Sequence, residues 1–236
     1  MIIFIKLLLA HLIGDFLLQP GSWVEHKERY KAKSKYLYIH VLLHFVVTLL
    51  ILWDLSYWKI ALIIMVSHYI IDVLKLYTTP LFKHANVPFF IDQALHLIVL
   101  YCCAFYTDLW PHTVSLFEKI DWPLVTTAFF VTFPAAIIMG KVLERMSAQI
   151  DVDHESLPNA GKYIGIIERL FVLIFIVIGN WASIGLLITA KSVFRFNDLK
   201  ESNNRKLTEY ILIGTLTSFG LAIVAGLIYL KIKDFP

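Results

Sequence analysis

The chain has 236 residues, of which 58% are hydrophobic and 17% are charged, and its mean hydropathy is +0.71. Soluble domains are usually about 45–50% apolar. The charged residues of this chain fall in clusters between long apolar runs, a pattern typical of membrane helices that excludes an ordinary soluble domain. The formal net charge of +3 is too small to indicate a nucleic-acid partner.

A helix that crosses the hydrocarbon core needs about 20 mostly apolar residues. The sequence therefore predicts an all-α fold, a polytopic bundle with about seven or eight spans. Their expected ranges are 2–19, 37–53, 58–76, 89–107 and 123–142, then two within 161–197, and last 207–230. Pro134 is expected to kink the fifth span. Gly179-Asn180 is expected to divide 161–197, although one span or a re-entrant pair also fits that stretch.

Lysine and arginine residues concentrate in the cytoplasmic loops of membrane proteins. Fifteen of them fall on the side that holds the loop after the first span, and four fall on the other side. This asymmetry predicts a multi-pass protein of the inner (cytoplasmic) membrane with both termini outside. The chain is expected to form a single membrane domain, in which 1–107 form two similar hairpins and 108–236 add C-terminal helices.

Each of the first four expected spans carries two ionisable residues spaced i, i+4. The pairs are His11 and Asp15, His40 and His44, His68 and Asp72, and Asp92 and His96. This spacing places both side chains on one helix face, one turn apart. An ionisable residue in hydrocarbon costs about 2.5–3.5 kcal/mol on insertion scales, so each pair calls for a functional explanation. Because successive spans alternate in direction, all four pairs are expected at one depth, in the cytoplasmic half of the membrane.

The hairpins also have the appearance of a duplication. His11-Leu-Ile-Gly-Asp15 is similar to His68-Tyr-Ile-Ile-Asp72, and a helix that starts with a second pair follows each segment. Two such units side by side would give a site with pseudo-twofold symmetry. Imidazole and carboxylate groups together suit Zn²⁺, Fe²⁺ or Mn²⁺, and eight groups leave room for one or two ions. Hydrogen bonding between helices and a proton relay are the alternatives. Gln19 and Gln93 adjoin the site, where they would orient ligands or pack between helices.

A second set of polar residues is expected at the same membrane face. Glu168 and Glu209 are candidate general bases, and Arg169, Lys191, Arg195 and Tyr210 are candidate substrate-binding residues for an anionic group such as phosphate. The basic residues would alternatively anchor the protein to lipid headgroups, and the two glutamates would pair with them. The remaining histidines, at positions 26, 84, 112 and 154, are expected to be solvated in loops.

Several of these motifs resemble those of a bacterial domain-of-unknown-function family of small polytopic membrane proteins. The resemblance lies in His11-Leu-Ile-Gly-Asp15-Phe-Leu-Leu-Gln19, in His68-x3-Asp72 with Lys75, and in Asp92-Gln-x2-His96. In the second half it lies in Ile166-Ile-Glu-Arg169, Ala190-Lys-Ser-x2-Arg195 and Glu209-Tyr-x3-Gly-Thr215. The His-x3-Asp element is also similar to one in membrane-bound metal-dependent hydrolases, which implies a reaction class by analogy alone.

Three functions compete at this point. The first is a metal-dependent hydrolase, with the lipid bilayer as its surroundings and a lipid-linked or phosphorylated membrane substrate. The second is a metal-ion or small-solute transporter, since transporter sites commonly lie between repeats and beside broken helices. The third is a membrane di-iron oxidase, for which His40-x3-His44 is one suitable box, although tandem histidine boxes are missing.

Overall fold

The computed structural model describes residues 1–83, 86–107, 120–147, 160–202 and 205–233, without the side chains of 194–202 and 205. Within these ranges the chain forms ten α-helices and three short 3-10 helices, with no strand, so the prediction of an all-α fold is confirmed. The chain divides into two compact units, Met1–Thr126 and Thr127–Phe235. Each unit is described by itself.

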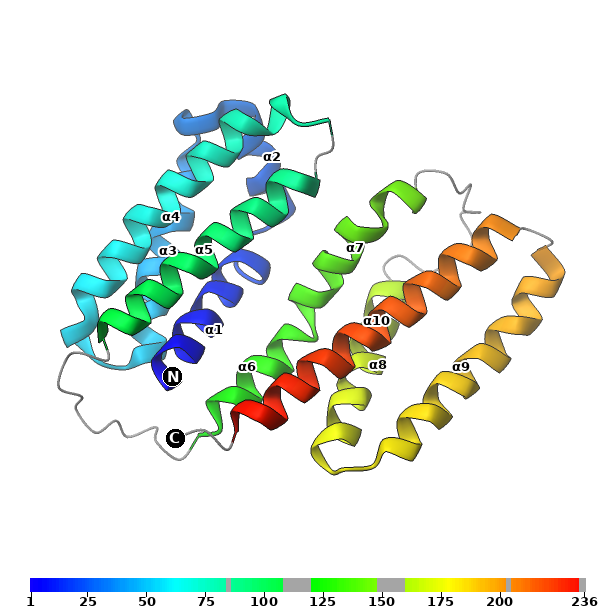
Figure 1. Ribbon diagram of the computed structural model, residues 1–236. Helices are drawn as coiled ribbons and strands as arrows, with labels where there is room; N and C mark the ends of the chain where they lie inside the picture. The colour runs from blue at the N-terminus through cyan, green and yellow to red at the C-terminus, as the bar shows by residue number, and fades with distance from the viewer. Residues whose placement is uncertain (84–85, 108–119, 148–159, 203–204, 234–236) are drawn as a thin grey trace. The chain divides into compact units, whose positions relative to one another are not determined.

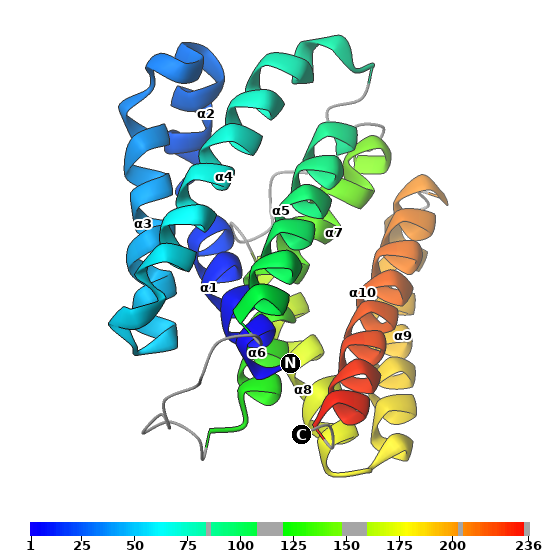
Figure 2. The ribbon, with the colours of Figure 1, turned by 60° about the vertical axis from the view of Figure 1, so that its left-hand side comes forward.

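The first unit is a four-helix bundle with a short helix at one end. The bundle helices are α1 (Ile2–Phe16), α3 (Lys35–Leu52), α4 (Trp58–Thr78) and α5 (Asn86–Thr107). They pack in a closed ring, because α1 contacts α3, α3 contacts α4, α4 contacts α5, and α5 returns to α1. α1 and α4 run in one direction and α3 and α5 in the other (Figures 1 and 2). Each helix therefore turns one face toward a common axis.

The ring order agrees with the predicted duplication. α1 carries the first His-x3-Asp element and α4 carries the second, and these two helices stand diagonally across the ring. α3 and α5, the second helices of the two hairpins, form the other diagonal. A twofold rotation about the bundle axis exchanges diagonal partners, so this packing is the one that a duplicated hairpin with pseudo-twofold symmetry requires.

A helix that the sequence did not predict lies in the connection between α1 and α3. α2 (Gly21–Tyr30) begins after Pro20, whose extended backbone ends the preceding turn, and it is bent by 79° from α1. Figure 1 shows α2 at the end of the bundle where α4 finishes. The 3-10 helix Lys31–Lys33 then returns the chain to α3. This polar connection is thus a folded element at the mouth of the bundle.

The second unit is built from α7 (Phe133–Ser147), α8 (Ala160–Val177), α9 (Trp181–Ser202) and α10 (Arg205–Ile232). α10 packs against α7 and α8, and α8 also contacts α9. The predicted break at Gly179-Asn180 is present: Gly179 has a φ of +73°, which a glycine adopts without steric cost. The Asn180 side chain then accepts a hydrogen bond from Ser183 N at 3.2 Å, which caps the start of α9.

The polarity of the described residues is that of a membrane protein. Large apolar side chains face outward, among them Leu50, Ile98, Phe105 and Leu186, whereas histidines and aspartates lie inside the first unit. Within the part of the chain that the structure describes, five helical segments are long and apolar enough to cross a membrane, or six if the bent pair of α1 and α2 is one span. The sequence predicted seven or eight spans. α8 is charged at Lys162, Glu168 and Arg169, and the apolar part of α9 is the short segment Trp181–Val193.

The predicted kink in the fifth span is also present. α6 (Trp122–Phe130) and α7 form one membrane-length segment, interrupted at residues 131–132 just before Pro134. Arg169 of α8 donates from Nε to Val131 O at 2.7 Å and from Nη2 to Thr132 O at 3.2 Å. It also donates from Nη1 to Ser218 Oγ at 3.0 Å. A buried guanidinium therefore satisfies the backbone carbonyls at the interruption, as an apolar environment requires.

We expect Arg169→Met to destabilise the protein, because it removes the donor to Val131 O, whereas Thr132 O still accepts from Ala136 N. Each buried acceptor left unpaired costs about 1–3 kcal/mol. The measurement is the thermal midpoint of the purified protein in detergent micelles, with Arg145→Met as the control, since Arg145 lies at the end of α7, away from the break. An unchanged midpoint for Arg169→Met would contradict this structural role.

Candidate metal centre

The four pairs predicted from the sequence meet on the axis of the first unit. The five histidines of these pairs are 1–3% exposed, and Asp72 and Asp92 are 5% and 2% exposed. Each pair lies on the inward face of its helix, as the i, i+4 spacing predicted. The expectation that the eight side chains converge is confirmed by this geometry.

The eight residues form two layers, because the helices alternate in direction. One layer is a cluster of four imidazoles, one from each helix: His11, His44, His68 and His96. Ring centroids are 3.8 Å apart for His44 and His68, 4.0 Å for His68 and His96, and 5.1 Å for His11 and His96. The other layer, one turn nearer α2, holds Asp15, His40, Asp72 and Asp92. The first layer is thus rich in nitrogen ligands and the second is acidic.

Asp15 links the two layers. Its Oδ1 atom lies 3.0 Å from His44 Nε2, 3.3 Å from His40 Nε2 and 3.4 Å from His68 Nε2. Two ligands of a tetrahedral ion with bonds of about 2.0–2.1 Å are separated by about 3.3 Å. The Asp15–histidine distances therefore match those between ligands of one ion.

Gln93 completes the surroundings of Asp15. Its Nε2 donates to Asp15 Oδ2 at 2.9 Å, and its Oε1 lies 3.3 Å from His11 Nε2. The sequence left open whether Gln93 orients ligands or packs between helices, and these contacts place it against two candidate ligands. The Nε2 atom of Gln19, the other glutamine considered, is buried without a hydrogen-bond partner among the described residues.

His96 presents a nitrogen lone pair to the interior. Its Nδ1 lies 2.9 Å from the backbone carbonyl of Asp92, which can only accept, so Nδ1 carries the proton. The lone pair is then on Nε2, which is buried and has no partner among the described residues, like Asp92 Oδ1 beside it. A second nitrogen fixed by a carbonyl is the usual arrangement of a metal-binding histidine. These two atoms are therefore suited to a cation.

Three overlapping groups bring ligand atoms within 4.8 Å of one another. The first is His11, Asp15, His44 and His68; the second is His40, His68 and Asp72; the third is Asp15, Asp92 and His96. The first group combines three imidazoles with one carboxylate, which is a four-coordinate set for Zn²⁺, Fe²⁺ or Mn²⁺. Because Asp15 belongs to the first and third groups, a second ion could share its carboxylate.

Two lysines that the sequence assigned to cytoplasmic loops reach into the acidic layer. Lys27 of α2 is buried and donates to Asp72 Oδ2 at 2.8 Å. Lys75 of α4 donates to Asp92 Oδ2 at 2.8 Å. Lys75 follows Asp72 by one helical turn, a spacing that places it on the same face; nothing in the sequence points to Lys27. A position in a polar connection concealed the role of Lys27, whereas Lys75 already belonged to one of the motifs quoted from the sequence.

The lysines make Asp15 different from the other two aspartates. Asp72 and Asp92 each have an ammonium group at 2.8 Å, whereas Asp15 has imidazoles and Gln93 as its hydrogen-bonding neighbours among the described residues. With the histidines neutral, three carboxylates and two ammonium groups leave the core a net charge of −1. A net charge is costly inside a bilayer, so the core favours either a cation or one protonated histidine.

Gly14 allows His44 to approach α1. A Cβ atom at Gly14 would lie 2.6 Å from His44 Nε2, closer than side chains pack. The glycine of the His-Leu-Ile-Gly-Asp motif therefore makes room for the imidazole that contacts Asp15. The corresponding residue in the second repeat is Ile71, so the two halves of the site differ at this position.

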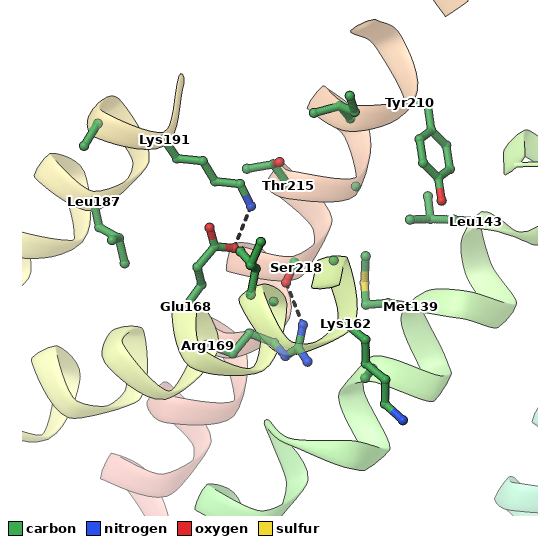
Figure 3. A pocket seen from close by; sticks show the side chains of 17 residues that line it. Met139, Leu143, Lys162, Glu168, Arg169, Leu187, Lys191, Tyr210, Thr215 and Ser218 are labelled. Atoms are coloured by element: carbon green, nitrogen blue, oxygen red, sulfur yellow. Dashed lines mark hydrogen bonds and ion pairs between the residues drawn. The ribbon is translucent and has the colours of Figure 1, made fainter. Parts of the chain in front are cut away.

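The second set of predicted site residues lies in the second unit. Glu168, Arg169, Lys191 and Tyr210 line a pocket of ≈ 600 Å³ between α7, α8, α9 and α10 (Figure 3). Lys191 Nζ donates to Glu168 Oε2 at 2.6 Å, the pairing that the sequence gave as an alternative to catalysis. Glu209 is exposed on α10, and Arg195 lies outside the side chains that the structure describes. The structure brings four of the six together.

Of the four histidines expected in loops, the structure describes His26. His26 is half-buried, with Nδ1 2.8 Å from Ser34 Oγ and its ring 4.9 Å from that of Tyr36, so it is packed rather than freely solvated. This packing holds α2 against the start of α3. The other three, at positions 84, 112 and 154, lie outside the described residues.

Fold and core together define a polytopic membrane protein with a buried histidine–aspartate centre. Residues 3–124, just over half of the chain, match the family model described as "Protein of unknown function (DUF3307)". The chain therefore belongs to this family, and the resemblance seen in the sequence is confirmed at that level. The match contains the whole centre and ends before the motifs of the second half. No curated protein and no solved structure matches the chain.

We expect Gly14→Ala to displace the His44 ring and to weaken cation binding at Asp15. Overpacking of this kind costs about 1–3 kcal/mol. The measurements are the thermal midpoint and the zinc content of protein purified in detergent. Gly140→Ala in α7 is the matched control, because a Cβ there meets no atom within 4 Å. Equal zinc content in Gly14→Ala and the wild type would contradict this packing role.

We expect Lys27→Met to lower the thermal midpoint in chelator, since loss of one partner of a buried ion pair costs about 3–5 kcal/mol. Zn²⁺ should restore it, because Asp72, His40 and His68 can then bind a cation in place of the ammonium group. The double variant Lys27→Met/Asp72→Asn should recover stability without zinc, and Lys33→Met, at an exposed position, should change nothing. A wild-type midpoint for Lys27→Met would rule out the buried pair.

Proposed function

We propose that the protein is an intramembrane metalloprotein that holds one or two divalent transition-metal ions, with zinc as the first candidate. The observation that carries the proposal is the group of His11, Asp15, His44 and His68, whose ligand atoms lie within 4.8 Å of one another. A divalent ion there would bind the carboxylate that no ammonium group pairs with, and it would change the net charge of the core from −1 to +1. Hydrogen bonding alone gives a weaker account, because it leaves the buried lone pair of His96 Nε2 without a partner among the described residues.

The activity we propose for this centre is metal-dependent hydrolysis of a phosphorylated or lipid-linked substrate at the cytoplasmic leaflet of the inner membrane. A bound divalent ion would supply Lewis-acid chemistry for such a reaction. Within the chain, Gln93 would hold Asp15 in position, and Lys75 would hold the Asp92 carboxylate in position. From the sequence, Glu168 and Glu209 are the candidates for a general base, and Lys191, Arg195 and Tyr210 those for substrate contacts. All five belong to the second unit, which is described separately from the centre.

The proposed orientation follows from the charges of the loops together with α2. α2 carries Lys27 and Arg29 in its last turn and lies at the end of the bundle nearest the acidic layer. If that end faces the cytoplasm, as the distribution of lysine and arginine favours, the acidic layer lies in the inner half of the membrane. A substrate with an anionic headgroup would then meet this end first.

A metal-ion carrier is the second candidate function, and a specific observation favours it. The first group shares His68 with the second and Asp15 with the third, so an ion could pass through the first group by exchanging one ligand at a time. The histidines are also almost completely buried. Such burial is expected of an occluded transport site, whereas a catalytic metal ion needs a coordination position that water or substrate can reach.

The test begins with the metal content of protein purified in detergent, measured by mass spectrometry of the elements. We expect about one divalent ion or more per chain, lost in His11→Ala/His68→Ala and retained in His26→Ala, whose ring lies outside the centre. Absence of metal from the wild type after incubation with Zn²⁺, Fe²⁺ or Mn²⁺ would overturn the metal proposal. An iron content with two ions per chain would favour the oxidase.

The second step separates hydrolysis from transport. We expect the wild type in liposomes to release phosphate from a lipid phosphate monoester or diphosphate, and Asp15→Asn to abolish this release. Vesicles loaded with a zinc-sensitive dye should show no protein-dependent influx. Influx without phosphate release would reverse the ranking of the two functions.

A further inference from the structure

The pocket in the second unit has apolar walls and a polar centre. Met139 and Leu143 of α7, Leu187 of α9 and Ile211 of α10 supply apolar walls. Lys191 and Glu168 form an ion pair within it, with side chains 23% and 14% exposed (Figure 3). Such a pocket suits a ligand with an apolar body and a charged end.

The charge of the lining specifies the sign of that end. Among the described lining residues, Lys162, Arg169 and Lys191 are cationic and Glu168 is anionic, which gives these residues a net charge of +2. The Lys191 ammonium has three donors, so it can keep its bond to Glu168 and still donate to an oxyanion. Thr215 lines the pocket near Lys191 and adds a neutral donor, whereas Tyr210 points toward Leu143 (Figure 3). A phosphate group has the oxygen acceptors that this set requires.

One glycine of the lining leaves space for the apolar part of the ligand. Gly161 and Gly165 of α8 and Gly214 of α10 line the pocket, but a Cβ at Gly165 would lie 3.0 Å from Arg169 and one at Gly214 would lie 3.3 Å from Leu143. At Gly161 a Cβ would meet no atom within 4 Å, so the space beside this residue belongs to the pocket. The volume of ≈ 600 Å³ holds part of a lipid, namely the headgroup region and the first segment of its chains.

We propose that this pocket binds a membrane lipid with an anionic phosphate headgroup. The phosphate contacts Lys191 and Thr215, and the chains lie along the apolar walls formed by α7, α9 and α10. A lipid is the occupant that fits, because the pocket belongs to a unit that contains membrane-length helices and most of its described lining is apolar. The pocket includes Lys191 and Tyr210, which the proposed function gives as candidate substrate contacts, but lipid binding here needs no metal in the first unit.

The test is lipid binding by the full-length protein, measured by native mass spectrometry from detergent micelles. The probes are phosphatidic acid, phosphatidylcholine and diacylglycerol with the same acyl chains, and inorganic phosphate as a competitor. We expect phosphatidic acid to bind most tightly and millimolar phosphate not to displace it. Equal binding of diacylglycerol or phosphatidylcholine would overturn the proposal, and so would full displacement by inorganic phosphate, which would indicate a site for free phosphate.

Two variants test the location of the site. Gly161→Leu fills open space without a clash, and Lys191→Met removes the ammonium group; each should weaken phosphatidic acid binding about tenfold or more. The matched controls are Gly185→Leu, at another unobstructed glycine outside the pocket, and Lys141→Met, which removes an exposed lysine of α7. Both controls should bind like the wild type, with thermal midpoints recorded for all four.

A misfolded variant is recognised by its thermal midpoint, and Gly161→Leu keeps the test valid if Lys191→Met fails to fold. Wild-type affinity in folded Gly161→Leu would place the lipid elsewhere and refute the proposal. The same assay on His11→Ala/His68→Ala separates the two proposals. Lipid binding should persist there, so failure of the metal site and failure of the lipid site give different results.

Discussion

The inability of a bilayer to solvate charge is the constraint on which this structure depends. Eight imidazoles and carboxylates lie within a bundle whose outer surface is apolar, and water cannot satisfy them there. Side chains inside the bundle form hydrogen bonds with these groups instead of water. A lysine donates to Asp72, another lysine donates to Asp92, and histidines and Gln93 surround Asp15. The closed ring of four helices is the arrangement that lets these groups reach one another.

The same constraint shapes the second unit. The interruption between α6 and α7 exposes backbone carbonyls at membrane depth, and the buried Arg169 side chain supplies their donors. Glu168, the preceding residue, pairs with Lys191 across the pocket. These two adjacent residues of α8 thus have different surroundings. Arg169 donates hydrogen bonds to backbone carbonyls, and Glu168 lines the pocket.

The duplication gives the centre its residues, and departures from symmetry give it a preferred site. Diagonal helices contribute matching His-x3-Asp elements, yet Gly14 stands where the second repeat has Ile71. The His44 ring occupies the space over Gly14, and this brings it to Asp15. The lysines neutralise the other two aspartates. One carboxylate is therefore left to three imidazoles, which is why we propose that group as the principal site for an ion.

The sequence by itself determined the all-α membrane fold, the pairs of ionisable residues, their duplication and the breaks near Pro134 and Gly179. These follow from local periodicity and backbone geometry, which depend on neighbours within a few residues. Tertiary structure alone decided that α2 folds over the bundle, that Lys27 reaches Asp72, and that Arg169 binds backbone carbonyls. Such contacts join residues 37–45 positions apart. No local pattern specifies which distant partner a long cationic side chain reaches, because that depends on how the helices pack.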